Sequence, residues 1–162
     1  MIQRINAGHL SATGPHVRVT VQASPVNAVS VDRIYISQVS STGNPWDSAG
    51  DLTAIYDFTA NQNQPFVVPA GMQLALPIVA YTINQFQSLL IAVDFTPGPA
   101  SGVPTGPVSG TAYQSGVPIS EASVYYLLSV KEAGKQTRSP NYTFAQTGGT
   151  SFVIFVTNIE VG

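Results

Sequence analysis

The stretch from Gln64 to Phe95 constrains the fold more than any other part of this sequence. It reads QPFVVPAGMQLALPIVAYTINQFQSLLIAVDF, and apolar residues dominate it except at a polar corner, residues 84–88. Pro69-Ala70-Gly71 is typical of a turn, because proline fixes φ and glycine readily adopts a positive φ. The stretch therefore predicts consecutive apolar strands joined by short turns.

Pro77 lies in the middle of one of these strands, residues 72–83. Because proline cannot donate a ladder hydrogen bond, this segment is predicted to be an edge strand or a strand broken in two. Residues 89–95 (LLIAVDF) form a continuous apolar run. Such a run is typical of a central strand that is buried on both faces.

Alternating residues indicate further strands on either side of this stretch. Residues 15–23 alternate three valines with polar residues, which predicts one buried and one solvated face. Residues 28–39 alternate too, but the parity changes at Asp32-Arg33, which predicts a bulge or a bend. The remaining predicted strands are residues 51–58, 66–68, 123–130, 141–145 and 151–161.

No segment shows a sustained helical period, and the only expected helix is a turn or two near Ala133. About eight or nine strands, spaced by about ten residues, predict an all-β fold, a single β-sandwich of antiparallel strands and most simply a jelly roll. The sandwich domain is expected to span residues 15–162. Residues 1–14 are expected to be a frayed terminus, or an arm that orders on a neighbouring subunit. Residues 96–114, rich in proline and glycine, are expected to form a long loop.

Charged side chains are scarce in this chain. They make up only 9% of its residues, whereas about 25% is usual for a globular domain. The net charge is −2 and the six Lys and Arg residues are scattered, which argues against a surface that binds nucleic acid. The chain has no Cys, so disulfides, thiolate metal sites and thiol redox chemistry are excluded.

The N-terminal residues lack the apolar run of a secretory signal, and no stretch approaches about 18 uninterrupted apolar residues. We therefore expect no membrane-spanning segment, and a protein that is made in the host cytoplasm. That expectation is compatible with assembly into a virion.

Patterns typical of catalysis are missing from the sequence. The two histidines, His9 and His16, both lie near the N-terminus, and no G-x-S-x-G elbow occurs. The acidic residues lie mostly at expected strand ends, where Asp commonly forms turns. We therefore expect a protein that is not an enzyme and needs no cofactor. Asn44, Asp47 and Asp51 offer oxygen ligands for Ca²⁺ from one loop, but their spacing matches no EF-hand loop.

Trp46 and Tyr113 both lie in expected loops, and two roles fit them. In the first, they form with Asp47 an aromatic platform for a sugar ring, as in a lectin or a carbohydrate-binding module. In the second, Trp46 folds back as a lid on the edge of the core and Tyr113 packs against a neighbour. The second role is favoured, and glycan binding is the alternative.

Five segments carry a resemblance to a known family. With motifs that include VVPAG, they resemble a β-sandwich domain found ahead of SGNH (GDSL-type) hydrolase domains and, alone, in phage structural proteins. The resemblance spans residues 15–161, but Ala75-Leu76-Pro77 stands where the family often has Ser-Asp before the proline. The five segments are Ile34 to Ile36, Val67 to Gly71, Leu89 to Phe95, Gly110 to Tyr113 and Val153 to Val161.

The resemblance implies the non-catalytic partner of such hydrolases, because the chain has no Gly-Asp-Ser block and no downstream Asp-x-x-His. We therefore expect a structural virion protein, most simply a phage head decoration (cement) protein or a small tail or fibre component. It is expected to act as a symmetric homo-oligomer, with a trimer favoured, and to bind the major capsid protein or another virion protein. The residues expected to contact neighbouring subunits are Met1, Ile2, Arg4, His9, Leu10, Val103, Pro104, Pro107 and Val108.

Overall fold

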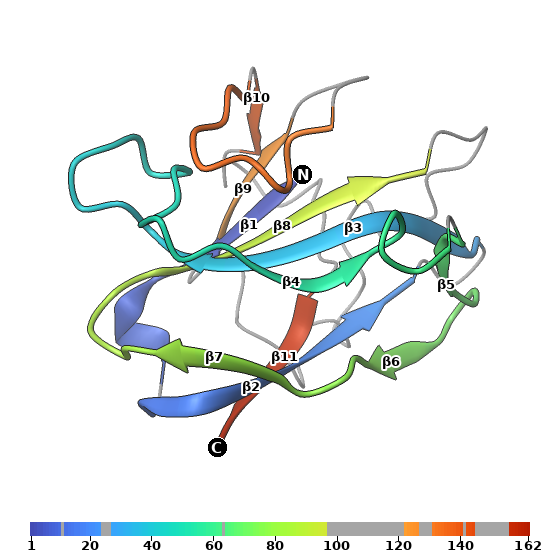
Figure 1. Cartoon of the computed structure of the whole chain (residues 1–162), viewed down its shortest axis with the longest axis horizontal. Helices are drawn as coiled ribbons and strands as arrows, with labels where there is room; N and C mark the ends of the chain where they lie inside the picture. Colours follow the sequence, from blue (N-terminus) through green and yellow to red (C-terminus); the bar gives the residue numbers. More distant parts are fainter. Residues whose placement is uncertain are drawn as a thin grey trace.

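The computed structural model describes residues 1–10, 12–23, 27–62, 64–96, 122–126, 131–140, 142–144 and 156–162. These residues form eleven β-strands in two antiparallel sheets, and one short 3-10 helix, η1 (Ala7–His9) (Figure 1). The strands are β1 (Ile2–Ile5), β2 (Gly14–Gln22), β3 (Val29–Gln38), β4 (Thr53–Asp57), β5 (Phe66–Val68), β6 (Gln73–Ala75), β7 (Val79–Ile83), β8 (Leu89–Phe95), β9 (Ala122–Tyr126), β10 (Tyr142–Phe144) and β11 (Val156–Val161).

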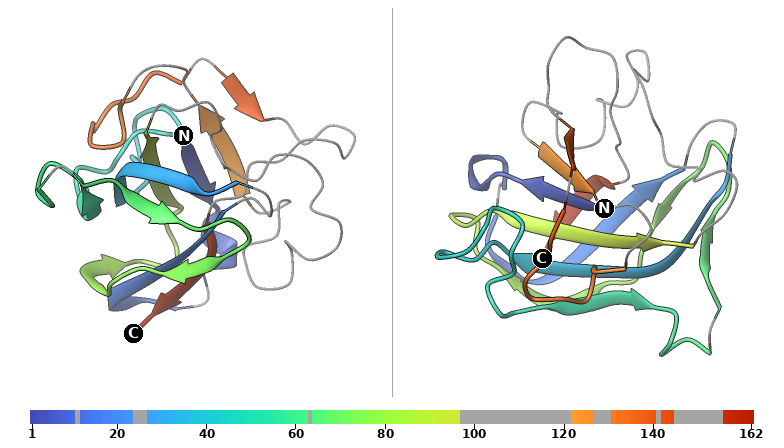
Figure 2. Two further views of the ribbon diagram at one scale, coloured as in Figure 1. Left: turned by 90° about the vertical axis from the view of Figure 1, so that its right-hand side faces the viewer. Right: turned by 90° about the horizontal axis from the view of Figure 1, so that it is seen from above.

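The larger sheet has the strand order β10-β9-β1-β8-β3-β4, and β5 also pairs with β3. The right panel of Figure 2 shows this sheet from above, from β4 through β3, β8 and β1 to β9. The smaller sheet has the order β11-β2-β6, and β7 also pairs with β2. The main core lies between the two sheets and includes the three valines of β2 and Ile34 and Ile36 of β3. The predicted all-β sandwich is therefore confirmed, whereas a jelly-roll winding stays a prediction.

Strand β8 is the central strand that the sequence predicts. It lies between β1 and β3, and its residues from Leu89 to Asp94 are buried. Its alternate residues face opposite ways, because successive side chains of a strand point to opposite faces. Leu89, Ile91 and Val93 belong to the main core, while Leu90 and Ala92 belong to a second apolar cluster on the other face of the sheet.

The expected N-terminal arm is wrong for residues 2–5, which form β1 inside the larger sheet. Ile2 pairs with Ala92 on one side and with Tyr125 on the other, so β1 lies between β8 and β9. Ile5 enters the main core and Ile2 enters the second cluster. A four-residue strand with two polar residues in its middle has no periodicity that a sequence pattern detects.

Three smaller expectations about local structure have clear outcomes. The register between β3 and β8 shifts between Val31 and Arg33, which confirms the bulge predicted at Asp32-Arg33. The predicted break at Pro77 is also confirmed, since β6 ends before it and β7 begins after it. The helix expected near Ala133 is a turn instead. Within the described part of the chain, no helix is long and apolar enough to cross a membrane.

Gln3 ties the first strand to the last one across the interior. Its side-chain Nε2 donates to the carbonyl of Val156 at 3.1 Å, and the Val156 N–H donates to its Oε1 at 3.0 Å. Both residues are buried, and they belong to different sheets. The amide therefore satisfies a buried backbone donor and a buried backbone acceptor at once, which a hydrophobic side chain cannot do.

We expect Gln3→Leu to lower the free energy of unfolding by about 2–4 kcal/mol, because it leaves the N–H and the carbonyl of Val156 buried without partners. Urea unfolding followed by tryptophan fluorescence measures the loss. Gln136→Leu is the matched control, because Gln136 is exposed and the same change there leaves no buried group unpaired. Equal stabilities of the two variants would contradict the role given to Gln3.

Candidate interaction surface

In the described part of the chain, two loops cover the outer face of the larger sheet. Ala133 and the ring of Trp46 pack there against the second apolar cluster, which includes Tyr125. The rings of Trp46 and Tyr125 meet edge to face, with their centroids 5.1 Å apart. The indole Nε1 of Trp46 donates to the carbonyl of Arg138 at 3.0 Å. Trp46 is thus the lid on the core edge that the favoured sequence interpretation predicts.

Arg138 fastens these two loops to each other. Its side chain is buried, and its guanidinium donates to the carbonyls of Trp46, Glu132 and Ala133 at 3.0, 3.2 and 2.9 Å. Its backbone N–H donates to Oδ1 of Asp47 at 3.1 Å. Burial lowers the pKa of Arg138, and the charge of Asp47 opposes that change. The site is a structural clamp, because these four hydrogen bonds all join Arg138 to acceptors of the chain itself.

The carboxylate of Asp47 is used entirely within this clamp. Besides the Arg138 amide, it accepts hydrogen bonds from the backbone and side-chain nitrogens of Asn44 at 2.9 and 3.0 Å. The residue is buried, so the expectation that Asp47 offers its carboxylate to a sugar is wrong. Tyr113, the third residue of the expected glycan platform, lies outside the described residues.

The carboxylates expected to bind calcium, those of Asp47 and Asp51, accept hydrogen bonds from within the chain. Asp51 accepts hydrogen bonds from the Gln38 backbone N–H, the Ser48 hydroxyl and the Tyr81 hydroxyl. Burial raises the pKa of Tyr81, and its hydrogen bond to Asp51 raises it further. Among the described residues, no group of three or more acidic or histidine side chains is placed to hold a metal ion.

A second polar network lies where β3, β4 and β8 run side by side. Asp57 accepts hydrogen bonds from the Tyr35 hydroxyl at 2.6 Å and from the Thr59 backbone and hydroxyl at 2.9 and 2.6 Å. The Nε of Arg33 lies 3.6 Å from the Asp57 carboxylate. Burial acts to raise the pKa of Asp57, but the hydrogen bonds from Thr59 and Tyr35 outweigh it and lower that pKa to about 2.

Asp94, at the end of β8, behaves in the opposite way. Its carboxylate is buried and accepts hydrogen bonds from the backbone N–H groups of Glu132 and Ala133 at 3.0 and 3.1 Å. Burial raises the pKa of Asp94, and these hydrogen bonds only partly oppose the rise. Asp94 therefore anchors the segment 131–140 onto the sheet at one end, while Arg138 anchors it at the other.

Three of the residues expected to contact neighbouring subunits, Met1, Ile2 and Leu10, pack within the chain instead. Ile2 is buried in the second cluster, so the expectation that it contacts a neighbour is wrong. Met1 and Leu10 are half-buried and pack against the main core, and Arg4 is half-buried. The backbone of His9 belongs to η1. The remaining candidates, Val103, Pro104, Pro107 and Val108, lie outside the described residues.

A different surface stands out once the strands are in place. Residues 64–88, here called the neutral edge, contain no Asp, Glu, Lys, Arg or His. They include β5 on the larger sheet and β6 and β7 on the smaller one. Among the described strands, each of these three pairs on one side only, β5 with β3 and the other two with β2. Within the described part of the chain, the neutral edge therefore forms a border of both sheets.

Exposed apolar side chains gather on this border. Among the described residues, five large apolar side chains are exposed, and all five belong to the neutral edge. Isolated exposed apolar residues are ordinary, but a concentration of them on one uncharged border is typical of a protein-binding surface. The five are Val67 (49% exposed), Met72 (54%), Leu74 (37%), Ile78 (63%) and Phe86 (81%).

Local geometry explains why these side chains point outward. Val68 of β5 enters the main core, so Val67, one position before it, faces away from the core. Leu74 of β6 pairs with Val21 at the border of the smaller sheet and stays 37% exposed there. The turn between the two strands is closed by the Met72 N–H, which donates to the Pro69 carbonyl at 3.1 Å. This turn leaves the Met72 side chain outside, next to β6.

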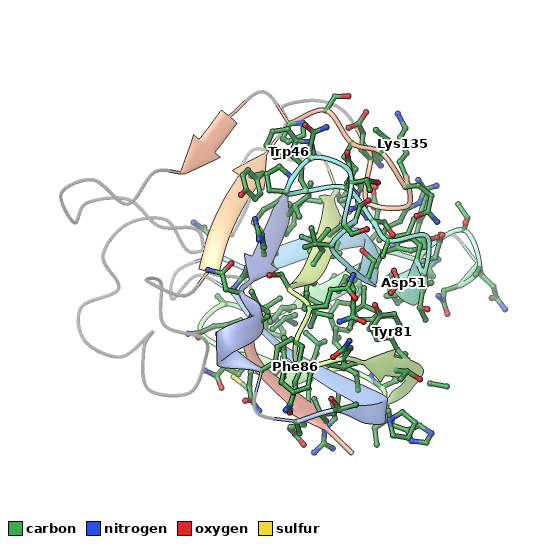
Figure 3. All side chains as sticks on the ribbon, turned by 90° about the vertical axis from the view of Figure 1, so that its left-hand side faces the viewer. Trp46, Asp51, Tyr81, Phe86 and Lys135 are labelled. Atoms are coloured by element: carbon green, nitrogen blue, oxygen red, sulfur yellow. The ribbon has the colours of Figure 1, made fainter. Side chains whose placement is uncertain are left out.

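Phe86 is the most exposed of the five, yet its turn is held firmly. Its N–H donates to Oδ1 of Asn84 at 3.0 Å, and the Gln38 side chain donates to the Asn84 carbonyl at 2.8 Å and the Gln87 carbonyl at 3.2 Å. The Gln87 side chain in turn donates to the Val39 carbonyl at 2.7 Å. Figure 3 looks onto this end of the molecule, with Phe86 below Asp51 and Tyr81 and far from Trp46.

No known protein-family model matches the chain, and no curated protein matches it either. The interpretation of the neutral edge therefore depends on its own chemistry.

The apolar pattern of residues 64–88 predicts a core rather than a surface, although the lack of charge in the same residues is visible in the sequence. No charged residue lies between Asp57 and Asp94, and the apolar pattern of this run predicts only core. Leu74 and Leu76 are indistinguishable by residue type, but Leu74 is exposed and Leu76 is buried. The absence of charge over such a length is the feature that could have identified an interface within the core-forming segment.

The low pKa of Asp57 has a consequence for stability. A carboxyl whose pKa falls on folding stabilises the folded state above its usual pKa, and the stabilisation is lost as the pH falls toward the folded value. We expect Asp57→Asn to lower the free energy of unfolding by about 1–2 kcal/mol at pH 7, after allowance for partial exposure, and by progressively less between about pH 4 and pH 2. Urea unfolding at a series of pH values measures the difference. Tyr35→Phe, which removes one donor only, should give a smaller loss, and a difference that does not change with pH would contradict the assignment.

Proposed function

We propose that this protein is a non-enzymatic structural component of a virion that works as a symmetric homo-oligomer. A phage head decoration (cement) protein fits best, and a small tail or fibre component is the other form of the same role. The proposal is supported by the neutral edge, which carries all five exposed large apolar side chains of the described residues.

The chemistry of this border suits contact between proteins. The cores of protein interfaces are depleted of charged residues, and burying an unpaired charge costs several kcal/mol. Residues 64–88 contain no charge that a partner would have to neutralise. A partner that covers this border removes apolar surface from water without leaving an ion behind.

The contact is expected to be made by side chains rather than by adding a strand. Strands β5 and β6 have three residues each, and Pro65, Pro69 and Pro77 flank them. Short strands and prolines are the devices by which proteins protect sheet edges from further strand pairing. The border is thus open to apolar packing and closed to extended β-addition.

The strength of one such contact indicates how the protein would be used. Burying the exposed part of each of the five side chains contributes about 1 kcal/mol, or about 5 kcal/mol together. The loss of translational and rotational freedom on association offsets this gain, so a single contact of this kind is weak. Weak contacts of this size become firm when several copies bind a repeating surface together, as on a symmetric particle.

The carbohydrate-binding alternative lacks comparable support. Trp46 gives its indole N–H to Arg138, and Asp47 holds Asn44 and Arg138. Neither side chain is left to form an open platform for a sugar.

Mass photometry and co-sedimentation with capsids assembled from the major capsid protein of the same genome test the proposal. We expect the unaltered chain to form a defined homo-oligomer, a trimer in the favoured form, and to sediment with the capsids. Ile78→Asp places a charge on the neutral edge and should lower oligomer formation at least about tenfold. Thr42→Asp is the matched control, because Thr42 is exposed outside the neutral edge. A chain that stays monomeric and never sediments with capsids would end the proposal.

A further inference from the structure

We propose that the amine of Lys131 and the carboxyl of Asp32 condense into an amide, which forms a covalent cross-link between β3 and the segment 131–140. The two side chains form an ion pair, although the residues are 99 positions apart in the chain. This inference does not depend on the proposed role in a virion. It adds a modification site made by the chain's own side chains, in a protein that has no Cys for disulfides.

This pair differs from the other ion pairs of the described residues. The Asp32 side chain is only 4% exposed. The arginine pairs use guanidinium groups, which stay charged and have no free amine to form an amide. Lys135 pairs with Glu132 only three positions away, and its side chain is 56% exposed. Among the described ion pairs, Lys131–Asp32 alone joins an amine to a carboxyl that is almost completely shielded from water.

The carboxyl of Asp32 is held in one orientation. The Thr96 hydroxyl donates to its Oδ1 at 2.6 Å, while the Lys131 Nζ donates to its Oδ2. The backbone is fixed as well, because the Asp32 carbonyl accepts from the Phe58 N–H at 2.8 Å. One carboxyl oxygen is thus bound by a hydroxyl, and the other faces the amine.

Lys131 is held in place from its own side. The next two residues, Glu132 and Ala133, donate their backbone N–H groups to Asp94 at 3.0 and 3.1 Å, which fastens the chain beside Lys131 to β8. The Lys131 Nζ also lies 5.5 Å from the centre of the Phe58 ring. Holding two reacting groups in contact makes their reaction intramolecular, which accelerates it strongly.

The amide forms from this pair without an added reagent. Burial acts to raise the pKa of Asp32, but its hydrogen bonds with Lys131 and Thr96 outweigh burial and lower that pKa, so the pair is ionic at neutral pH. The ammonium therefore first gives one proton to Oδ2. The neutral amine then attacks Cγ of Asp32, and the Thr96 hydroxyl stabilises the negative charge that develops on Oδ1. Oδ2 leaves as water with two protons from the nitrogen, and the amide remains.

The cross-link would make part of the cover over the second apolar cluster permanent. The segment 131–140 supplies Ala133 to that cluster, and its other attachments are hydrogen bonds and ion pairs. The new bond would also close a chain loop from residue 32 to residue 131, which restricts the unfolded chain. The cross-linked protein is therefore expected to unfold at a higher urea concentration than the same chain without the bond.

Intact mass spectrometry of the unaltered chain, purified and then incubated at neutral pH, tests the inference. We expect a product lighter by one water that accumulates with time and yields, after chymotrypsin digestion, a peptide containing Asp32 joined to one containing Lys131. Lys131→Arg retains a cation but no amine, so it should keep its full mass. Lys135→Arg is the matched control and should lose water as the unaltered chain does. Thr96→Val should form the product at least about tenfold more slowly.

Three results would contradict these expectations. An unaltered chain that keeps its full mass after prolonged incubation would overturn the cross-link. Equal loss of water from Lys131→Arg would overturn it too, because a succinimide formed at an aspartate also releases water and needs no lysine. Equal rates for Thr96→Val and the unaltered chain would overturn the role given to the Thr96 hydroxyl.

Discussion

Strand β8 is buried on both faces, and each face needs its own cover. The smaller sheet covers one face and forms the main core with Leu89, Ile91 and Val93. No sheet covers the other face in the described part of the chain, so two loops, around Trp46 and residues 131–140, close it over Leu90 and Ala92. Loops carry many backbone polar groups, and burying them requires partners. The two loops that cover Leu90 and Ala92 therefore need buried polar partners, and the buried Arg138, Asp47 and Asp94 supply them.

These buried charges are structural, because each one satisfies backbone groups of the covering loops. Arg138 donates to three carbonyls, and Asp94 accepts from two amides at the opposite end of the same segment. A charged group holds several polar backbone groups together more strongly than a neutral one does. Trp46 and Asp47, whose residue types suit ligand binding, instead form hydrogen bonds with Arg138 that hold these loops. The exposed large apolar side chains of the described residues lie instead in residues 64–88, which carry no charge.

Sequence patterns predict most of the sandwich, since alternation marks β2, an unbroken apolar run marks β8 and Pro77 marks the break between β6 and β7. They fail where the deciding contact is distant in the chain. Strand β1 is too short to show a period, and its position depends on β8 and β9. Trp46 and Asp47 depend on Arg138, about ninety residues away. The proposed interaction surface lies within the segment whose sequence is most typical of a core, because residue type alone does not separate inward from outward apolar side chains.

The lack of charge on the neutral edge also determines how an assembly joined there would respond to ionic strength and temperature. Contacts between charged surfaces weaken as salt screens them, whereas apolar contacts do not depend on such screening. Subunits joined at the neutral edge would hold together across wide changes of ionic strength, and cooling would weaken them instead. Without electrostatic steering, the subunits would also meet at the ordinary rate of about 10⁵–10⁶ M⁻¹ s⁻¹. An assembly of this kind would therefore tolerate transfer between solutions of low and high salt.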